Sequence, residues 1–281
     1  MPVRFSQFLR SVRRLVAFGW VILVSSIAFV CRPSHRRSLR SRAIWLQQTC
    51  RSALQALGVS YSFTGTPPAG GSCVAPNHVS YLDILVLAAA TPCVFVAKRE
   101  VRTWPIFGWF AQMAGTRFVD RERRGDVARV GAEFAPTLEA GLCLVFFLEG
   151  TSTDGRGVLP FKSSLLEPAI RAHTPVVPAA LAYEVPPGHS ATQEVSWWGE
   201  MTLVPHLFNL AGVPHVAARL AFGTPLASFN NRKLLAATLC NHVRMLHREI
   251  NGVSFGESSP RPQSLGLAGA NSVNENSHAF T

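Results

Sequence analysis

Short apolar runs alternate along most of this chain with longer segments in which apolar residues recur at helical spacing. Apolar runs of about 4 to 8 residues between polar breaks are typical of buried strands. They lie at residues 61–64, 72–75, 93–97, 116–119, 142–147, 175–181 and 215–222. Helical patterns lie at residues 81–90, 106–114, 126–140, 164–173 and 232–251. This alternation predicts an α/β fold, with a mixed sheet flanked by helices, over residues 58–253.

The N-terminal segment, residues 1–57, has a different pattern, in which arginines border one long apolar run. Residues 15–31 carry no charge, and the first acidic residue of the whole chain is Asp83. A bilayer span needs about 17 to 25 apolar residues, so this run either crosses a membrane once or dips into one leaflet. The denser arginine cluster follows the run, which predicts that the rest of the chain lies at the cytoplasmic face of the membrane.

Residues 34–57 continue as a basic helical pattern with apolar positions between the arginines. The pattern suits a membrane interface, with apolar side chains in lipid and arginines at anionic headgroups, and an ordinary packed helix is the alternative. The net charge of +11 originates here, because residues 1–60 hold ten arginines and no acid. Basic patches also bind nucleic acid, but the adjoining apolar run indicates membrane lipids as partners and no nucleic acid. Residues 254–281, rich in Ser, Gly, Asn and Pro, are predicted to be a disordered tail,.

Neither the cysteines nor the common catalytic fingerprints indicate a metal or nucleotide site. The six cysteines are scattered and form no Cys-x-x-Cys pair, which is typical of reduced core thiols in a cytoplasmic domain. The sequence contains no Gly-x-Ser-x-Gly elbow, no P-loop and no His-Glu-x-x-His pattern,. We therefore expect no bound metal.

The polar cluster at residues 77–83 stands between a predicted strand and a predicted helix. His78 can take a proton from a hydroxyl near neutral pH, and Asp83 can fix the ring tautomer and stabilise the imidazolium. Residues five apart do not share a helix face, so the pair forms only if His78 lies in the preceding loop. Alternatively, Ser80 and Asp83 form a capping box at the start of the helix, and the two interpretations are compatible.

Further polar groups follow other predicted strands, at the sheet edge where the active sites of α/β proteins gather. Lys98 and Arg121 are cations that can pair with a phosphate, although Arg121 can equally pair with an acid beside it on the surface. Residues 149–151, Glu-Gly-Thr, form either a plain turn or a place where the backbone approaches a ligand closely,. Pro178 within a strand predicts a sheet edge or a bulge.

Four of these blocks, in this order, resemble the glycerolipid acyltransferase family, whose best known members are bacterial 1-acylglycerol-3-phosphate acyltransferases. The first block resembles the family's His-x4-Asp motif, and the third resembles its Glu-Gly-Thr motif. The resemblance covers residues 58–225, and Lys98 lies between the first two blocks. The matching positions are Asn77, His78, Ser80 and Asp83 in the first block, Gly115 and Arg121 in the second, Glu149, Gly150 and Thr151 in the third, and Pro178 in the fourth.

The resemblance implies a membrane-bound O-acyltransferase. His78 would take the proton of a lysolipid hydroxyl as it attacks an acyl thioester, and Asp83 would orient His78. Lys98, Arg121 and residues 149–151 would position the acceptor. The thioester of coenzyme A or of acyl carrier protein would be a co-substrate, so no cofactor is implied. The implied acceptor is 1-acylglycerol-3-phosphate, which gives phosphatidic acid in phospholipid biosynthesis.

One position departs from the family pattern. The third motif usually continues with an arginine that is expected to hold the acceptor phosphate, and this chain has Ser152 there. Residues 151–164, and residues 197–201 with His206, are more similar to a subgroup that includes lyso-ornithine-lipid acyltransferases, so lyso-ornithine lipid is the alternative acceptor. Two further hypotheses are a membrane-anchored lipid-binding protein that has lost catalysis, and a lipid-ester hydrolase that uses the same base on water.

Overall fold

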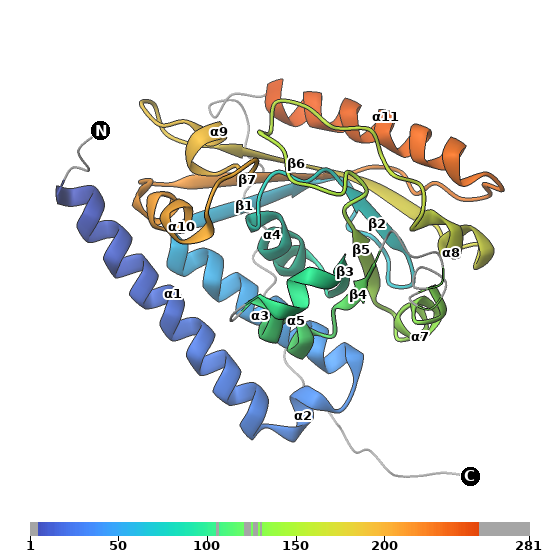
Figure 1. Cartoon of the computed structure of the whole chain (residues 1–281), viewed down its shortest axis with the longest axis horizontal. Helices are drawn as coiled ribbons and strands as arrows, with labels where there is room; N and C mark the ends of the chain where they lie inside the picture. The colour runs from blue at the N-terminus through green and yellow to red at the C-terminus, as the bar shows by residue number, and fades with distance from the viewer. Residues whose placement is uncertain (1–4, 105–106, 121–124, 126–128, 130, 253–281) are drawn as a thin grey trace, which may run out of the picture.

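The computed structural model describes residues 5–104, 107–120, 125, 129 and 131–252 (Figure 1). Within them, seven strands form one sheet in the order β1-β7-β6-β2-β5-β3-β4. The strands are β1 (Val59–Thr64), β2 (Cys73–Pro76), β3 (Cys93–Lys98), β4 (Arg117–Val119), β5 (Cys143–Phe146), β6 (Val176–Glu184) and β7 (Val216–Phe222). Each overlaps one of the predicted apolar runs, and the predicted mixed α/β sheet is confirmed.

Strand direction places the loops of interest at one edge of the sheet. The five strands β2 to β6 run parallel to one another, whereas β7 is antiparallel to β6 and β1 is parallel to β7. The carboxyl ends of β2, β3, β4 and β5 therefore share one edge, where ligands of α/β sheets usually bind. The segments after β2 and β5, residues 77–81 and 147–153, both begin at this edge.

Pro178 lies in the interior strand β6, where a bulge accommodates it. Ala179 pairs with Phe222 and Val176 pairs with Leu226, so two residues of β6 (177–178) face three residues that follow β7 (223–225). The extra residue lies in the segment after β7. A proline cannot donate to a sheet ladder, and a bulge removes the need for that donor. The Pro178 carbonyl still accepts a hydrogen bond from the Gly223 N–H, at 2.8 Å. The bulge expected from the sequence is confirmed, and an edge position is wrong.

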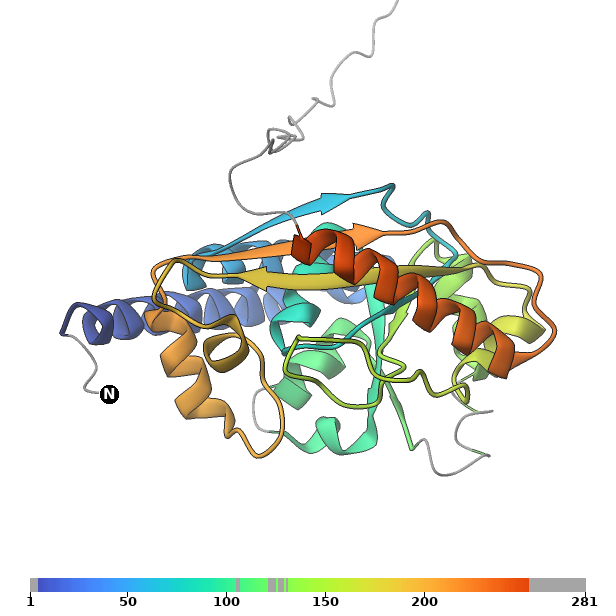
Figure 2. The ribbon, with the colours of Figure 1, turned by 90° about the horizontal axis from the view of Figure 1, so that it is seen from above.

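Helices cover both faces of the sheet (Figures 1 and 2). They are α1 (Phe5–Cys31), α2 (Pro33–Arg36), α3 (Leu39–Leu57), α4 (Leu82–Ala90), the 3-10 helix η1 (Arg99–Thr103), α5 (Phe107–Ala114), α7 (Phe134–Glu139), α8 (Leu166–Arg171), α9 (Ala191–Glu194), α10 (Leu203–Gly212) and α11 (Arg232–Gly252). Helices α3, α4, α5 and α10 pack on one face, around buried residues such as Leu54 and Leu210. Helices α7, α8 and α11 pack on the other, around Phe134 and Leu239.

The sequence pattern locates most of these helices but does not predict α9, α10 or η1. In α10, Pro205 interrupts the apolar pattern, although proline is tolerated in the first turn of a helix,. The helix predicted over residues 126–140 is present as α7 at its C-terminal end, and residues 126–128 and 130 lie outside the described residues. The remaining predicted helices differ from the observed ones only at their ends.

Helix α3 packs inside the fold and not on a lipid surface. Its apolar side chains Trp45, Leu54 and Leu57 are at most 3% exposed and belong to the same core as the sheet. The interfacial position predicted for residues 34–57 is therefore wrong for α3, and the alternative of an ordinary packed helix is confirmed. An amphipathic pattern specifies that one face is buried, but it does not specify whether lipid or a sheet covers that face.

Several arginines of the N-terminal segment bind the C-terminal ends of helices in the rest of the chain. The last carbonyls of a helix lack partners within the helix and carry partial negative charge, so a guanidinium stabilises them. These interactions attach α1 and α3 to α10, α5 and α4. The bonds join Arg10 to the Gly212 carbonyl (2.8 Å), Arg14 to Pro214 (2.8 Å), Arg42 to Met113 (2.6 Å) and Arg51 to Ala89 (2.9 Å).

Helix α1 keeps a long apolar face exposed. Val16 and Trp20 on this face are 67% and 65% exposed. Within the described residues, α1 is the helix that is long and apolar enough to cross a membrane, judged by length and composition. Its C-terminal half is attached to α3, because Trp45 Nε1 donates to the Ser25 carbonyl at 3.0 Å. The structure thus provides one apolar helix that can anchor the chain to a membrane.

Candidate active site

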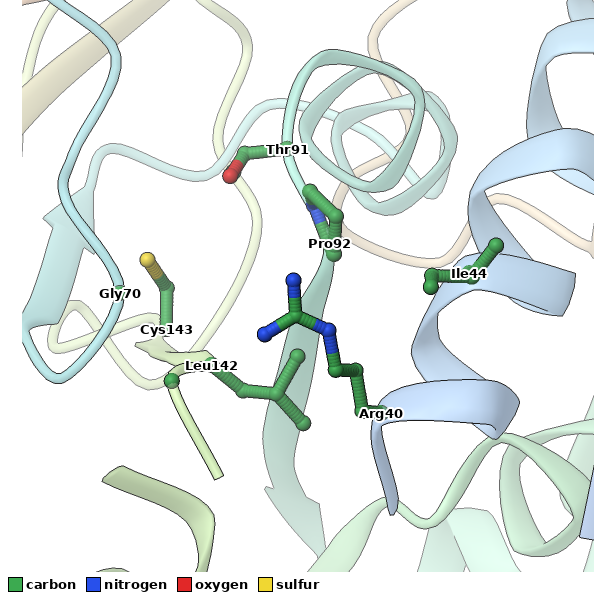
Figure 3. Close-up of a pocket in the computed structure, with 8 residues that line it drawn as sticks. Arg40, Ile44, Gly70, Thr91, Pro92, Leu142 and Cys143 are labelled. Carbon is green, nitrogen blue, oxygen red and sulfur yellow. The ribbon is translucent and has the colours of Figure 1, made fainter. Parts of the chain in front are cut away.

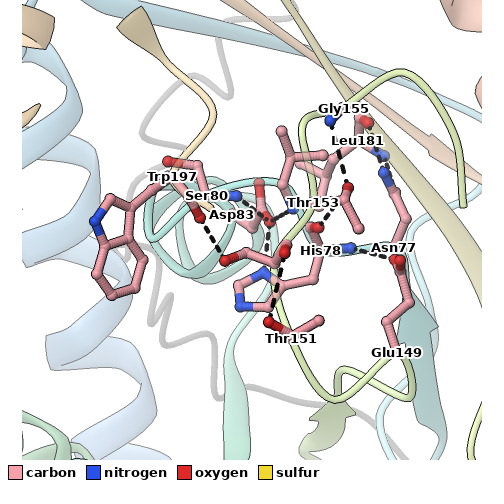
Figure 4. Close-up of polar contacts among 12 residues, drawn as sticks. Asn77, His78, Ser80, Asp83, Glu149, Thr151, Thr153, Gly155, Leu181 and Trp197 are labelled. Carbon is pink, nitrogen blue, oxygen red and sulfur yellow. Dashed lines mark hydrogen bonds and ion pairs between the residues drawn. The ribbon is translucent and has the colours of Figure 1, made fainter. Parts of the chain in front are cut away.

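Asn77 fixes the start of the loop between β2 and α4. The side chain is fully buried, its Nδ2 donates to the Leu181 carbonyl (3.0 Å), and its Oδ1 accepts the Leu181 N–H (2.7 Å). The amide side chain therefore extends the pairing of β2 with β6 beyond the last strand residue. The next residue, His78, leaves the sheet at a defined point above its carboxyl edge (Figure 4).

His78 and Asp83 form the hydrogen-bonded pair that the sequence pattern suggests. His78 Nδ1 lies 2.8 Å from Asp83 Oδ2, and His78 stands in the loop while Asp83 stands in the first turn of α4. A carboxylate only accepts, so Nδ1 carries the proton and Nε2 keeps its lone pair. Within the described residues, nothing bonds Nε2. The ring is therefore arranged to accept a proton from a ligand at the sheet edge.

Three hydrogen bonds besides the one from His78 fix the Asp83 carboxylate. Its Oδ2 also accepts the N–H groups of Val79 (2.6 Å) and Ser80 (3.0 Å), and its Oδ1 accepts the Tyr183 hydroxyl (2.6 Å). The bond from the Ser80 N–H is one half of a capping box, but the buried Ser80 hydroxyl has no partner among the described residues. Asp83 therefore fixes both the helix start and the imidazole, but a complete capping box does not form, because the Ser80 side chain does not bond the Asp83 N–H.

A buried aromatic ring supports the imidazole from the other side. The rings of His78 and Phe147 stack with their centroids 4.0 Å apart and 23° between their planes. Phe147 follows β5, so β2 and β5 together determine the position of the base. The His78 side chain is 19% exposed, which leaves part of the ring accessible to a ligand.

Glu149 is turned toward the protein interior. Its Oε1 accepts the His78 N–H (2.7 Å), its Oε2 accepts the Leu159 N–H (2.9 Å), and the residue is 3% exposed. Burial, opposed in part by these two hydrogen bonds, raises the pKa of Glu149 to about 7. The contacts differ from the acceptor-binding role that the motif implies, because both carboxylate oxygens are bound to the backbone.

The residues that follow Glu149 face outward more than it does. Gly150 has a φ of 80°, in the region that favours glycine, and an added Cβ would lie 3.0 Å from Lys162 Nζ,. The Lys162 ammonium therefore lies beside Gly150, and the next residue, Thr151, is exposed. Ser152 Oγ donates to the Trp197 carbonyl, so this hydroxyl is already engaged within the protein.

The remaining predicted positions have varied surroundings. Lys98 is exposed at the carboxyl end of β3, on the same sheet edge as His78. Gly115 has a φ of 85° and its N–H closes the last turn of α5 on the Gln112 carbonyl, at 3.2 Å, so its role here is to end a helix,. Arg121 lies outside the described residues. The structure therefore brings together Asn77, His78, Ser80, Asp83, Glu149 and Gly150.

A second segment at the site, residues 195–206, lies outside the four motif blocks. Trp197 N donates to the Val79 carbonyl at 2.9 Å. His206 on α10 is buried, accepts the Tyr81 hydroxyl at Nδ1 (3.0 Å) and donates from Nε2 to the Ser196 carbonyl (2.9 Å). These contacts attach residues 195–206 to the loop that carries His78. The similarity of residues 197–201 to one subgroup was the available signal.

Within the described residues, no cluster of three His, Cys, Asp or Glu side chains could hold a metal ion. A cavity of about 210 Å³ is lined by Arg40, Thr91 and Cys143, among others (Figure 3). Thr91 precedes β3 and Cys143 begins β5, so this cavity lies at the amino edge of the sheet, opposite His78. The candidate chemistry is therefore at the carboxyl edge and not in this cavity.

Comparisons with known proteins agree with this arrangement. A model of the family described as Acyltransferase matches residues 60–182. A lyso-ornithine lipid O-acyltransferase of Brucella abortus is 41% identical over 183 residues, which cover 60% of this chain and 68% of that protein. A 1-acyl-sn-glycerol-3-phosphate acyltransferase of Neisseria gonorrhoeae is 38% identical over 135 residues, 47% of this chain and 53% of that protein. The crystal structure of the 1-acyl-sn-glycerophosphate acyltransferase from Thermotoga maritima has the same fold, with a TM-score of 0.63 at 17% identity over 87% of this chain and 99% of that one.

Proposed function

Since this chain belongs to the acyltransferase family, we propose that His78 is the general base of its O-acyl transfer to a lysolipid hydroxyl. The observation that carries the proposal is the bond from His78 Nδ1 to Asp83 Oδ2, which leaves the Nε2 lone pair free at the carboxyl edge of the sheet. Acyl transfer to a lysolipid is the reaction of this chain and of its relatives.

The proposed chemistry needs one proton to move twice. His78 Nε2 takes the proton of the acceptor hydroxyl as that oxygen attacks the thioester carbonyl, and Asp83 stabilises the imidazolium that forms. The tetrahedral intermediate collapses, the C–S bond breaks, and the sulfur leaves with the proton from Nε2. An ester and a free thiol result, and the enzyme regains its starting state without a covalent acyl-enzyme. The thiol belongs to coenzyme A or to acyl carrier protein.

We propose lyso-ornithine lipid as the acceptor. The Ser152 hydroxyl is bound to the Trp197 carbonyl, where the family pattern supplies a guanidinium for a phosphate. Lys162 provides a single ammonium beside Gly150, which suits one carboxylate better than a phosphomonoester with nearly two negative charges,. The ornithine headgroup offers one carboxylate. 1-Acylglycerol-3-phosphate is the second candidate, because Lys98 is also exposed at this edge and a relative of that name is 38% identical.

We also propose that α1 lies in one leaflet, at the cytoplasmic face, and does not cross the bilayer. Arg10 and Arg14 near its start bind the carbonyls of Gly212 and Pro214, and Ser25 near its end binds Trp45. A helix that crossed about 30 Å of hydrocarbon would place its ends on opposite sides of the membrane. Both halves of α1 contact one globular body, so its exposed apolar face lies along the membrane surface.

The test uses purified protein in mixed micelles with labelled acyl-coenzyme A and acyl carrier protein thioesters, offered separately. Each is combined with lyso-ornithine lipid, with 1-acylglycerol-3-phosphate, or with no acceptor, and His78→Ala is the control. We expect ornithine lipid from the wild type and a loss of at least about 1,000-fold in His78→Ala. Phosphatidic acid alone would overturn the proposed acceptor. Turnover of His78→Ala close to that of wild type would overturn the proposed base, and free fatty acid without acceptor would indicate hydrolysis.

A further inference from the structure

We propose that Glu149 is a positioning residue that holds the His78 backbone, and that it does not bind the acceptor. One carboxylate oxygen lies 2.7 Å from the His78 nitrogen (Figure 4), and the other lies 2.9 Å from the Leu159 nitrogen. Glu149 thereby joins the catalytic loop to a segment more than 80 positions further along the chain. This inference deepens the proposed function and rests on His78 as the base.

The His78 peptide is held on both sides by the segment that follows β5. Glu149 accepts its N–H, while its carbonyl accepts the Thr153 N–H (2.9 Å) and the Thr153 hydroxyl (3.1 Å). A side chain moves with its peptide, so these three bonds set the point from which the imidazole projects. Asp83 then sets the rotation of the ring. Positioning of this kind governs rate, since a displacement of about 1 Å can reduce turnover about 100-fold.

We call the Glu149 carboxylate, with its bonds to the His78 and Leu159 N–H groups, the brace. Its contact with Leu159 connects it to a rigid helix. Leu159 follows Val158, whose carbonyl accepts two hydrogen bonds from Arg244 on α11, at 3.1 and 3.2 Å. Because α11 packs on the sheet, the backbone at Leu159 is held in place. Glu149 bonds both Leu159 and His78, so the position of Leu159 fixes that of the His78 N–H. An acceptor could reach Glu149 only by displacing one of these backbone contacts, because the carboxylate is buried.

The charge state of Glu149 decides how well the brace works. As a carboxylate, it accepts both N–H groups, whereas a protonated carboxyl directs one O–H toward an N–H and loses that bond. Asp83 on α4 disfavours the charged form, Arg244 on α11 favours it, and the Cys240 thiol on α11 also lies within its field. With a pKa of about 7, the brace is intact above neutrality and weakens below it.

The deciding experiment compares amide hydrogen exchange and kinetics in the full chain in micelles, for wild type and Glu149→Gln. The glutamine has the same shape but accepts only one of the two N–H groups. We expect faster exchange in the peptides that contain His78 and Leu159, a fall in kcat of about 10- to 100-fold and an acceptor KM unchanged within about threefold. Glu167→Gln is the matched control, because Glu167 pairs with Arg171 on the surface of α8, and both its exchange and its kinetics should match wild type.

Unchanged exchange at both peptides, or a raised acceptor KM with kcat unchanged, would overturn the inference in favour of acceptor binding. If Glu149→Gln fails to fold, wild type alone still decides. At about pH 8, after correction for intrinsic rates, the His78 and Leu159 amides should be strongly protected because both donate to the buried Glu149 carboxylate, and exchange at the intrinsic rate would refute the brace,. Hydrogen exchange does not depend on catalysis. Turnover in His78→Ala would therefore refute His78 as the general base without affecting the exchange test of Glu149.

Discussion

Asp83→Asn separates the catalytic role of Asp83 from its structural role. Asp83 accepts four hydrogen bonds, three at Oδ2 and one at Oδ1. An asparagine can turn its oxygen to the three donors on the Oδ2 side and its amide to the Tyr183 hydroxyl, which can accept. The ground-state geometry therefore survives, at a cost to folding of about 1 to 2 kcal/mol. The negative charge that stabilises the imidazolium is lost, and we expect kcat to fall about 100- to 10,000-fold.

Asp83→Ala is the companion variant, because it leaves the buried N–H groups of Val79 and Ser80 without an acceptor. It should lower the free energy of unfolding by about 3 to 5 kcal/mol in addition to abolishing turnover. Thiol release from acyl-coenzyme A, measured with a thiol reagent at saturating lysolipid, gives kcat, and denaturant titration in micelles gives stability. A kcat for Asp83→Asn within about threefold of wild type would refute the reasoning and leave Asp83 as a helix-start residue only.

Three further predictions concern charge, topology and the acceptor. Burial raises the Glu149 pKa from 4.5 to about 7, so folded wild type loses stability as the Glu149 proton leaves with rising pH, whereas Glu149→Gln has no proton to lose there,. The unfolding free energy of Glu149→Gln minus that of wild type should therefore rise by up to roughly 3 kcal/mol from about pH 5 to about pH 8. A difference independent of pH in denaturant titrations would contradict this. In sealed vesicles, an impermeant maleimide should label Phe5→Cys and the native, exposed Cys31 from the same side, and labelling from opposite sides would show that α1 spans. Ser152→Arg removes the bond to the Trp197 carbonyl and adds a guanidinium that can bind a phosphate,. The ratio of phosphatidic acid to ornithine lipid formed should then increase by about tenfold or more. An unchanged ratio would show that position 152 does not select the acceptor.

The sheet and the His78–Asp83 pair are predictable from sequence because each depends on local pattern. Short apolar runs give seven strands in the expected places, and the loop between β2 and α4 is bounded by one such run and one helical pattern. Once a loop precedes the helix, a spacing of five residues allows His78 to return over the first turn. Pro178 was less informative, since a missing N–H fits an edge strand or a bulge, and only the strand order shows that β6 is interior and requires the bulge,.

Other features depend on partners that are distant in sequence, and local pattern does not determine them. Glu149 could be identified as part of a motif, but its partners at His78 and Leu159 are fixed only when β2 and β5 pair. The arginines of residues 1–57 pose the same problem. A cation suits an anionic headgroup and a helix C-terminus equally well, so composition alone could not show that Arg14 binds the end of α10,.

Helix α10 joins α1, the helix that can anchor the chain to a membrane, to the loop that carries His78. Its C-terminal end receives Arg14 from α1, and His206 in its middle binds the Tyr81 hydroxyl at 3.0 Å, three residues after His78. The ten residues of α10 span about 15 Å,, and Leu210 and Ala211 near its C-terminal end belong to the same core as the sheet. The height of His78 above the exposed face of α1 is therefore set by packing and not by a linker. A lysolipid can then keep its acyl chain in the leaflet and present its acceptor hydroxyl to His78, which avoids the cost of moving that chain into water.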